Sequence, residues 1–319
     1  MLFYGFFDTG SRIIKENQPG KEDLMQQKTS PRRRKKKRKT GEILRNIAIT
    51  AVILVVTATV LKTGSCPERS GFSTYVQQAE IHWNKAPLRE LERESADCLR
   101  ELADSDRAVR QILESAEDYP LSLLELLAKN PEATGFVEAY PTHKEDTPAD
   151  TVGRIAAGEI PLLLQWDDQW GYTTYGSDFL AITGCGPTCL SMVAAGLTGD
   201  DTVTPHRVAE YAENNGYYVD GAGSTWSLMT EGCRNFGLWS RELPLDESLM
   251  RSELEAGAPI VCSMLPGDFT ENGHFIVIVG AEPEGFRVND PNSPARSGKV
   301  WPYETIAPQI GNLWAFYPA

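Results

Sequence analysis

The stretch Gly184-Cys185-Gly186-Pro187-Thr188-Cys189, followed by the apolar run from Leu190 to Leu197, organises the fold of this chain. Gly184 and Gly186 lack a Cβ, so the backbone can turn tightly and a second chain can approach it closely. Pro187 suits the first turn of a helix, where its missing N–H removes no hydrogen bond. The stretch therefore predicts a helix whose positive dipole end favours the thiolate form of Cys185. The same residues also suit a buried structural cysteine beside a Gly-Pro turn.

The period of the apolar residues changes along the rest of the chain. We expect a strand over Ile160–Gln165, and after the Cys185 helix three more helices over Pro205–Asn214, Ser224–Phe236 and Leu249–Ala256. Strands are expected over Pro259–Met264, His274–Val279, Gly285–Asp290, Lys299–Trp301 and Leu313–Tyr317. Helices followed by consecutive strands with hairpin signals predict an α+β domain, in which a helical half packs on an antiparallel sheet.

Three further polar residues supply what a nucleophilic thiol needs, namely a base, a group that orients the base, and a donor for the oxyanion. His274 begins a strand directly after Gly273, and Asp290 ends the next strand before Pro291. If these strands form a hairpin, the carboxylate can fix the imidazole tautomer. The amide of Gln165 is a candidate oxyanion donor. Each residue alone also suits an ordinary role, as a structural histidine, a turn carboxylate and an exposed strand-end glutamine.

The order of these residues along the chain, Cys then His then Asp, resembles that of papain-like peptidases. The motifs Gln165-Trp166-Asp167, Gly184-Cys185-Gly186-Pro187-Thr188, Gly273-His274-Phe275 and Asn289-Asp290-Pro291 resemble the double-glycine (bacteriocin-processing) branch of that superfamily. This resemblance implies a papain-like fold without a cofactor. It also implies that Cys185 is the nucleophile, His274 the general base, Asp290 its orienting group and Gln165 an oxyanion donor.

Charge divides the chain sharply near its beginning. Residues 1–46 hold 13 Lys/Arg against 5 Asp/Glu, including the basic run Arg32–Lys39, whereas residues 62–319 hold 18 Lys/Arg against 39 Asp/Glu. Between them, Ile47–Leu61 is uncharged and apolar. With its flanking residues this run approaches the length of a membrane span, and the basic side is expected to stay in the cytoplasm. A retained anchor is favoured, because the segment before it is far longer than an ordinary signal-peptide start, although the apolar run also suits a signal peptide.

The predicted domain organisation follows from these changes in composition. We expect a basic cytoplasmic tail over 1–42, a transmembrane anchor over 43–63, a stalk over 64–87, a helical segment over 88–140, a linker over 141–150 and a papain-like peptidase domain over 151–319. The acidic exported part is expected not to bind nucleic acid, because it would repel the phosphate backbone. The six cysteines match no zinc-site spacing, and outside the cell disulfides among them are expected.

The sequence thus predicts a membrane-anchored, single-pass cysteine peptidase whose catalytic domain is extracellular and acts on peptides or proteins at the cell surface. Two alternatives remain open. One is a papain-like amidase that cuts the peptide stems of peptidoglycan, which would use the same Cys-then-His order. The other is a cell-surface module that binds peptides in a papain-like groove without cleaving them.

Overall fold

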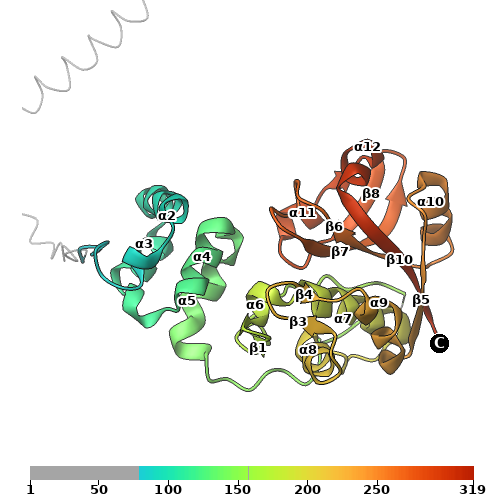
Figure 1. The fold of residues 1–319 in the computed structure, drawn as a ribbon, viewed down its shortest axis with the longest axis horizontal. Coiled ribbons are helices and arrows are strands. Elements are labelled where there is room, and N and C mark those ends of the chain that lie inside the picture. The colour runs from blue at the N-terminus through green and yellow to red at the C-terminus, as the bar shows by residue number, and fades with distance from the viewer. Residues whose placement is uncertain (1–78, 157) are drawn as a thin grey trace, which may run out of the picture. The chain divides into compact units, whose positions relative to one another are not determined.

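The computed structural model describes residues 79–156 and 158–319 (Figure 1). The predicted basic tail and membrane anchor lie outside these residues. Within the described ranges, no helix is long and apolar enough to cross a membrane.

A helical segment comes first. Its elements are η1 (Leu88–Glu90), α2 (Arg93–Ser105), α3 (Arg107–Glu114), η2 (Ala116–Asp118), α4 (Leu121–Lys129), η3 (Pro131–Ala133) and α5 (Thr134–His143). The last helix runs through Pro141 to His143, so it extends into the segment expected to be a linker. The leucines of α4 and the apolar residues of α2 and α3 form a common core. This core continues into the following domain through Tyr172 and Ala181.

The second part begins with the elements around Cys185. They are β1 (Thr174–Tyr175), β2 (Asp178–Phe179), α6 (Leu180–Thr183), α7 (Cys185–Thr198), α8 (Pro205–Asn214), β3 (Tyr218–Val219), β4 (Gly223–Ser224), α9 (Ser227–Thr230) and η4 (Gly232–Phe236). The helix expected over Ser224–Phe236 is therefore two short helical pieces. The strand expected over Ile160–Gln165 is wrong, since this stretch contains no strand. Instead, the Asn289 side chain donates to the carbonyls of Ile160 and Pro161 and holds the segment in place.

The last part forms the main sheet. Its elements are β5 (Leu238–Glu242), α10 (Glu247–Glu255), β6 (Ile260–Met264), β7 (His274–Glu282), β8 (Gly285–Asn289), α11 (Pro294–Ser297), β9 (Val300–Trp301), α12 (Tyr303–Ile306), η5 (Ala307–Gln309) and β10 (Ile310–Pro318). The strands lie in the order β5-β10-β6-β7-β8-β9, and every neighbouring pair is antiparallel. The predicted α+β class, with helices and an antiparallel sheet, is confirmed. Strand β5 was not predicted.

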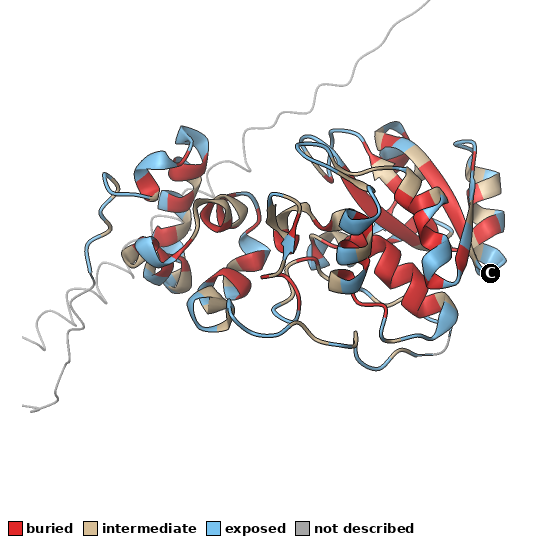
Figure 2. Ribbon diagram, turned by 60° about the horizontal axis from the view of Figure 1, so that its bottom comes forward, coloured by how far each residue is buried: buried red, intermediate tan, exposed pale blue. Residues whose placement is uncertain are grey.

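The two faces of the sheet bury different layers because successive strand residues point to opposite sides. Phe275 and Val277 of β7 belong to the core that contains α7, whereas Ile276 and Ile278 belong to the core under α10 and α12. Helix α7 is buried from Gly186 to Gly196, and buried residues gather on it and on the sheet (Figure 2). The sequence of α7 is apolar on all sides because the helix lies inside the domain.

Candidate active site

Helix α7 places Cys185 at its first residue. Gly184 precedes the helix, and the Thr188 hydroxyl donates to the Gly184 carbonyl over 2.8 Å, which fixes the first turn. Gly186 allows close contact with the loop that carries Ser224, because a Cβ at this position would lie 2.4 Å from the Ser224 Oγ. Cys185 is half-buried. Its side chain lines a cavity at the amino-terminal end of the helix.

His274 and Asp290 meet beside this thiol. His274 is the first residue of β7, and its Nε2 lies 2.8 Å from the Asp290 Oδ1. Asp290 directly follows β8 and is completely buried, while His274 is 8% exposed. Cys185 and His274 line the same two cavities. Because Asp290 occupies Nε2, the nitrogen left for Cys185 is Nδ1. The structure thus brings Cys185, His274 and Asp290 together.

The protonation of the pair follows from its surroundings. Burial alone lowers the pKa of His274, but Asp290 and the Cys185 side chain outweigh this effect and raise the pKa to about 10. Burial alone raises the pKa of Asp290, but His274 and Arg296 outweigh it and hold this pKa below its ordinary value. A positive imidazole beside a negative carboxylate is therefore the stable state at neutral pH.

Arg296 is a member of the site that the sequence did not indicate. Its Nε lies 2.5 Å from the Asp290 Oδ2, on the side of the carboxylate away from His274. The backbone N–H of Asn292 donates to Oδ1 over 2.8 Å. Both groups come from the loop that follows β8 and ends in α11, here called the Asp290 loop (residues 290–297). An arginine in a four-residue helix carries no sequence signal that connects it to the site.

Gln165 also lies beside Cys185, but its amide is already engaged. It is 2% exposed, and its Nε2 donates to the carbonyls of Ala181 and Ile182 over 2.8 and 3.3 Å. Its buried Oε1 has no partner within the described chain. The amide is therefore held against α6, directly before Cys185, with its oxygen free and its nitrogen bound.

Two cavities meet at Cys185 and His274, which line both of them. The larger one, of about 550 Å³, is bounded by Tyr218, the glycine-rich turn 221–223 and the half-exposed Trp226. The smaller one, of about 370 Å³, is bounded by Gln165, Arg296 and the loop 267–273. A substrate chain can therefore extend from the thiol in two directions.

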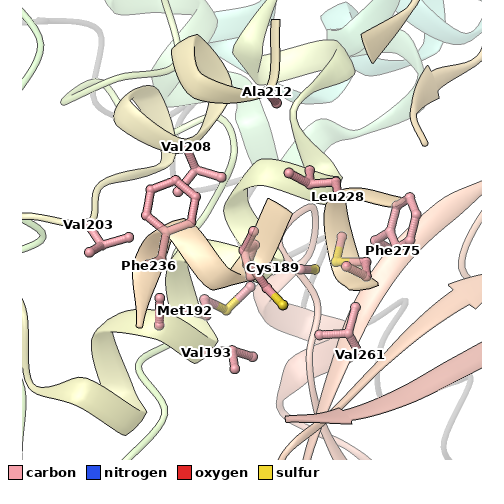
Figure 3. Packing of buried hydrophobic residues seen from close by; sticks show 14 of the residues in the cluster. Cys189, Met192, Val193, Val203, Val208, Ala212, Leu228, Phe236, Val261 and Phe275 are labelled. Carbon is pink, nitrogen blue, oxygen red and sulfur yellow. The ribbon is translucent and has the colours of Figure 1, made fainter. Parts of the chain in front are cut away.

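Cys189, one helical turn after Cys185, is a structural residue. It is completely buried, and burial raises its pKa. Figure 3 shows its side chain packed in the apolar cluster with Met192, Val193 and Val261. The five cysteines within the described ranges are free thiols, so the expected disulfides are not found among them. Of these five, only Cys98 and Cys185 are partly exposed.

Comparison with known proteins completes the description of this site. No curated protein matches the chain. Among solved structures, the peptidase domain of Streptococcus ComA, a bifunctional ABC transporter involved in quorum sensing, is similar at 18% identity with a TM-score of 0.34, over 43% of this chain and 93% of that one. A C39-like peptidase from Bacillus anthracis is similar at 16% identity with a TM-score of 0.35, over 52% of this chain and 98% of that one.

A family comparison covers the whole region in which Cys185, His274, Asp290 and Gln165 lie. Residues 158–316 match the Peptidase_C39 like family. Over these residues the chain belongs to the Peptidase_C39 like family, and it is a cysteine peptidase.

Proposed function

We propose that this cysteine peptidase hydrolyses peptide bonds through a triad of Cys185, His274 and Asp290. The observation that carries the proposal is the buried hydrogen bond of 2.8 Å between His274 and Asp290, next to a half-buried thiol at a helix start. The raised pKa of His274 supports a positive imidazole that pairs with a thiolate. Thiolate is the nucleophilic form of cysteine.

The reaction proceeds in two stages. The Cys185 thiolate attacks the amide carbonyl carbon, and the carbonyl electrons move to its oxygen. The tetrahedral intermediate collapses as His274 gives its proton to the leaving nitrogen. The C–N bond breaks, the amine departs, and the acyl group remains on Cys185 as a thioester. Neutral His274 then takes a proton from water, and the resulting hydroxide adds to the thioester. Collapse releases a carboxylic acid and restores the thiolate–imidazolium pair.

The oxyanion of each intermediate needs hydrogen-bond donors. The Cys185 backbone N–H belongs to the first turn of α7, where helix N–H groups lack intrahelical partners. We assign the second donor to the Gln165 amide. To donate, Gln165 gives up its longer bond of 3.3 Å to the Ile182 carbonyl and keeps the bond of 2.8 Å to Ala181.

We further propose that the enzyme is a single-pass membrane protein that works on the outer side of the cell membrane. The uncharged run over Ile47–Leu61 and the basic run before it support this placement. The substrate is then a peptide or protein at the cell surface. The acidic charge of residues 62–319 disfavours binding of nucleic acid by this part of the chain.

The deciding experiment measures the alkylation rate of Cys185 by iodoacetamide against pH in the full-length protein, with peptide mapping, beside His274→Ala. We expect fast alkylation well below the pKa of about 8.5 of a free thiol, strongly slowed in the variant. Cleavage of a peptide library, lost in Cys185→Ala, completes the test. Alkylation that follows an ordinary thiol, unchanged in His274→Ala, would refute the triad.

A further inference from the structure

The helical segment reaches the candidate active site at the end of α4. Asn130, which is 9% exposed, donates from its Nδ2 to the backbone carbonyl of Asn292 over 2.7 Å and to the Asn292 Oδ1 over 3.0 Å. Its own Oδ1 accepts from the Glu132 N–H over 3.2 Å, which begins η3. Asn130 therefore joins the turn that ends α4 to the Asp290 loop, 162 residues away in the sequence.

Glu132 holds the same loop two residues further on. One carboxylate oxygen accepts a short hydrogen bond from the Ser293 hydroxyl, and the other accepts from the Ala295 N–H over 2.8 Å. The Ser293 hydroxyl also accepts from the Arg296 N–H, so it begins α11. Glu132 therefore binds the first turn of α11, the short helix that carries Arg296.

Asn130 and Glu132 contact the same part of the Asp290 loop that binds the Asp290 carboxylate. Asp290 is bound by the Asn292 N–H and by the Arg296 guanidinium, in addition to His274. Asn130 binds Asn292 itself, and Glu132 binds the two residues on either side of Pro294. A shift of the loop would move both internal partners of the carboxylate at once. It would thereby weaken the bond that orients the imidazole.

The segment also forms part of the cleft. Lys129 and Asn130 line the smaller cavity together with Cys185 and His274. Ala181 of α6, four residues before Cys185, belongs to the apolar core of the helical segment. The segment thus supports both sides of the site, the nucleophilic turn through packing and the Asp290 loop through hydrogen bonds.

We propose that Asn130 and Glu132, here called the clamp, are positioning residues of the enzyme, and that the helical segment is a built part of the active site rather than a detachable cover. The proposal rests on the Cys185–His274–Asp290 triad proposed above. The clamp does not touch the reacting atoms. It sets the position of Asp290 and, through it, the charge of His274.

The test compares Glu132→Ala and Asn130→Asp with wild type in the full-length protein. Asn130→Asp keeps the shape but replaces the donor with an acceptor that repels the Asn292 carbonyl. In both variants His274 loses stabilisation of its positive form, so less thiolate–imidazolium pair forms. We expect Cys185 alkylation at pH 6 to slow on the order of tenfold or more, because small displacements of catalytic groups have effects of this size. At high pH the thiol ionises without the imidazole, so the rates of the variants should converge on that of wild type.

Two kinds of variant separate positioning from folding. Glu138→Ala removes an exposed glutamate of α5 and is expected to behave as wild type, while Glu132→Gln keeps one acceptor and is expected to recover part of the lost rate. Ser293→Ala removes the same hydrogen bond from the loop side, together with the cap of α11, and gives a second measurement should Glu132→Ala unfold. Thermal unfolding of each variant verifies that it is folded.

The outcomes are distinct. If wild-type Cys185 lacks enhanced alkylation, the triad itself fails. If wild type is activated but folded Glu132→Ala, Asn130→Asp and Ser293→Ala show the wild-type pH profile, the clamp is not a positioning device. A rate loss that is the same at every pH would also overturn the proposal, since it would indicate a structural role alone.

Discussion

The Asp290 carboxylate shares its charge between two cations, and this decides how the site responds to pH. His274 binds one oxygen and Arg296 the other. Arg296 lowers the pKa of Asp290, so the carboxylate stays charged into the acidic range although it is buried. The same cation also competes with His274 for the carboxylate. We therefore expect the activity of the enzyme to depend on a residue outside the proposed triad.

We expect Arg296→Gln to move the acidic limb of the kcat/KM profile to higher pH. Removing the cation raises the pKa of Asp290, so the carboxylate is protonated, and the imidazolium loses its partner, at a higher pH than in wild type. Arg296→Lys keeps the positive charge, so its acidic limb should lie close to that of wild type. Arg287→Gln, the same change on an exposed arginine of β8, is the control. An acidic limb that is identical in Arg296→Gln and Arg287→Gln would contradict this role.

His274 and Asp290 were the residues most open to prediction. His274 begins a strongly apolar strand and Asp290 follows the next strand along the chain, and hairpin pairing brings such ends together. Arg296 and the orientation of the Gln165 amide could not be predicted. They depend on where α11 and α6 pack, which no local pattern specifies.

At the scale of the elements, α7 packs closely against the β3–β4 hairpin because Gly186 has no side chain. Gly186 leaves room for Ser224, whose hydroxyl lies 2.8 Å from that of the buried Tyr175. The β3–β4 hairpin also bounds the larger cavity. The first turn of α7 and one wall of the larger cavity are therefore positioned by the same contact.

Gly186→Ala should destabilise the protein by about 1–3 kcal/mol and reduce turnover, because the added Cβ overpacks the contact with Ser224. The double variant Gly186→Ala/Ser224→Gly removes the atoms that the new methyl would meet and should recover stability. Urea unfolding and peptide cleavage measure both effects. If Gly186→Ala is as stable and active as wild type, the close contact does not position the helix.

Sequence patterns located the buried elements better than those at the edges. Strands β6 and β7 are runs of apolar residues with alternate sides in two cores, so their pattern is strong. Strand β5 lies at the sheet edge and contains the polar residues Ser240, Arg241 and Glu242, a pattern that is equally typical of a loop. The stretch 160–165 is apolar but contains no strand, because Asn289 and Pro291 bind its backbone in place of a neighbouring strand.

At the scale of the whole described chain, the apolar core of the helical segment extends into the peptidase domain. Phe136 of α5 stacks on Tyr172 with ring centroids 4.3 Å apart, and the Tyr172 hydroxyl donates to the Phe136 carbonyl over 2.7 Å. Gly171 is required here, since a Cβ would lie 2.7 Å from the Phe136 ring. The sequence predicted helices in this segment but offered no basis for these contacts, which join residues far apart in the chain.

We expect the helical segment and the peptidase domain to unfold in a single transition. Phe136→Ala removes a stacked, buried ring at their junction and should cost about 3–5 kcal/mol. Circular dichroism and tryptophan fluorescence should report the same lowered Tm, because both parts lose stability together. Phe136→Leu, which preserves most of the volume, should lose less. Two separate transitions, with only the first one moved by Phe136→Ala, would show that the parts unfold independently.

The meeting of two cavities at Cys185 bears on what happens after the first cut. In the proposed mechanism, one half of the substrate is bonded to the thiol once the amide breaks, and the other half is an amine that can leave by itself. Release is therefore ordered, and the vacated cavity is open to the next nucleophile. Water there completes hydrolysis. A second peptide amine bound in the same space would instead take the acyl group, so the occupancy of that cavity sets the partition between hydrolysis and aminolysis.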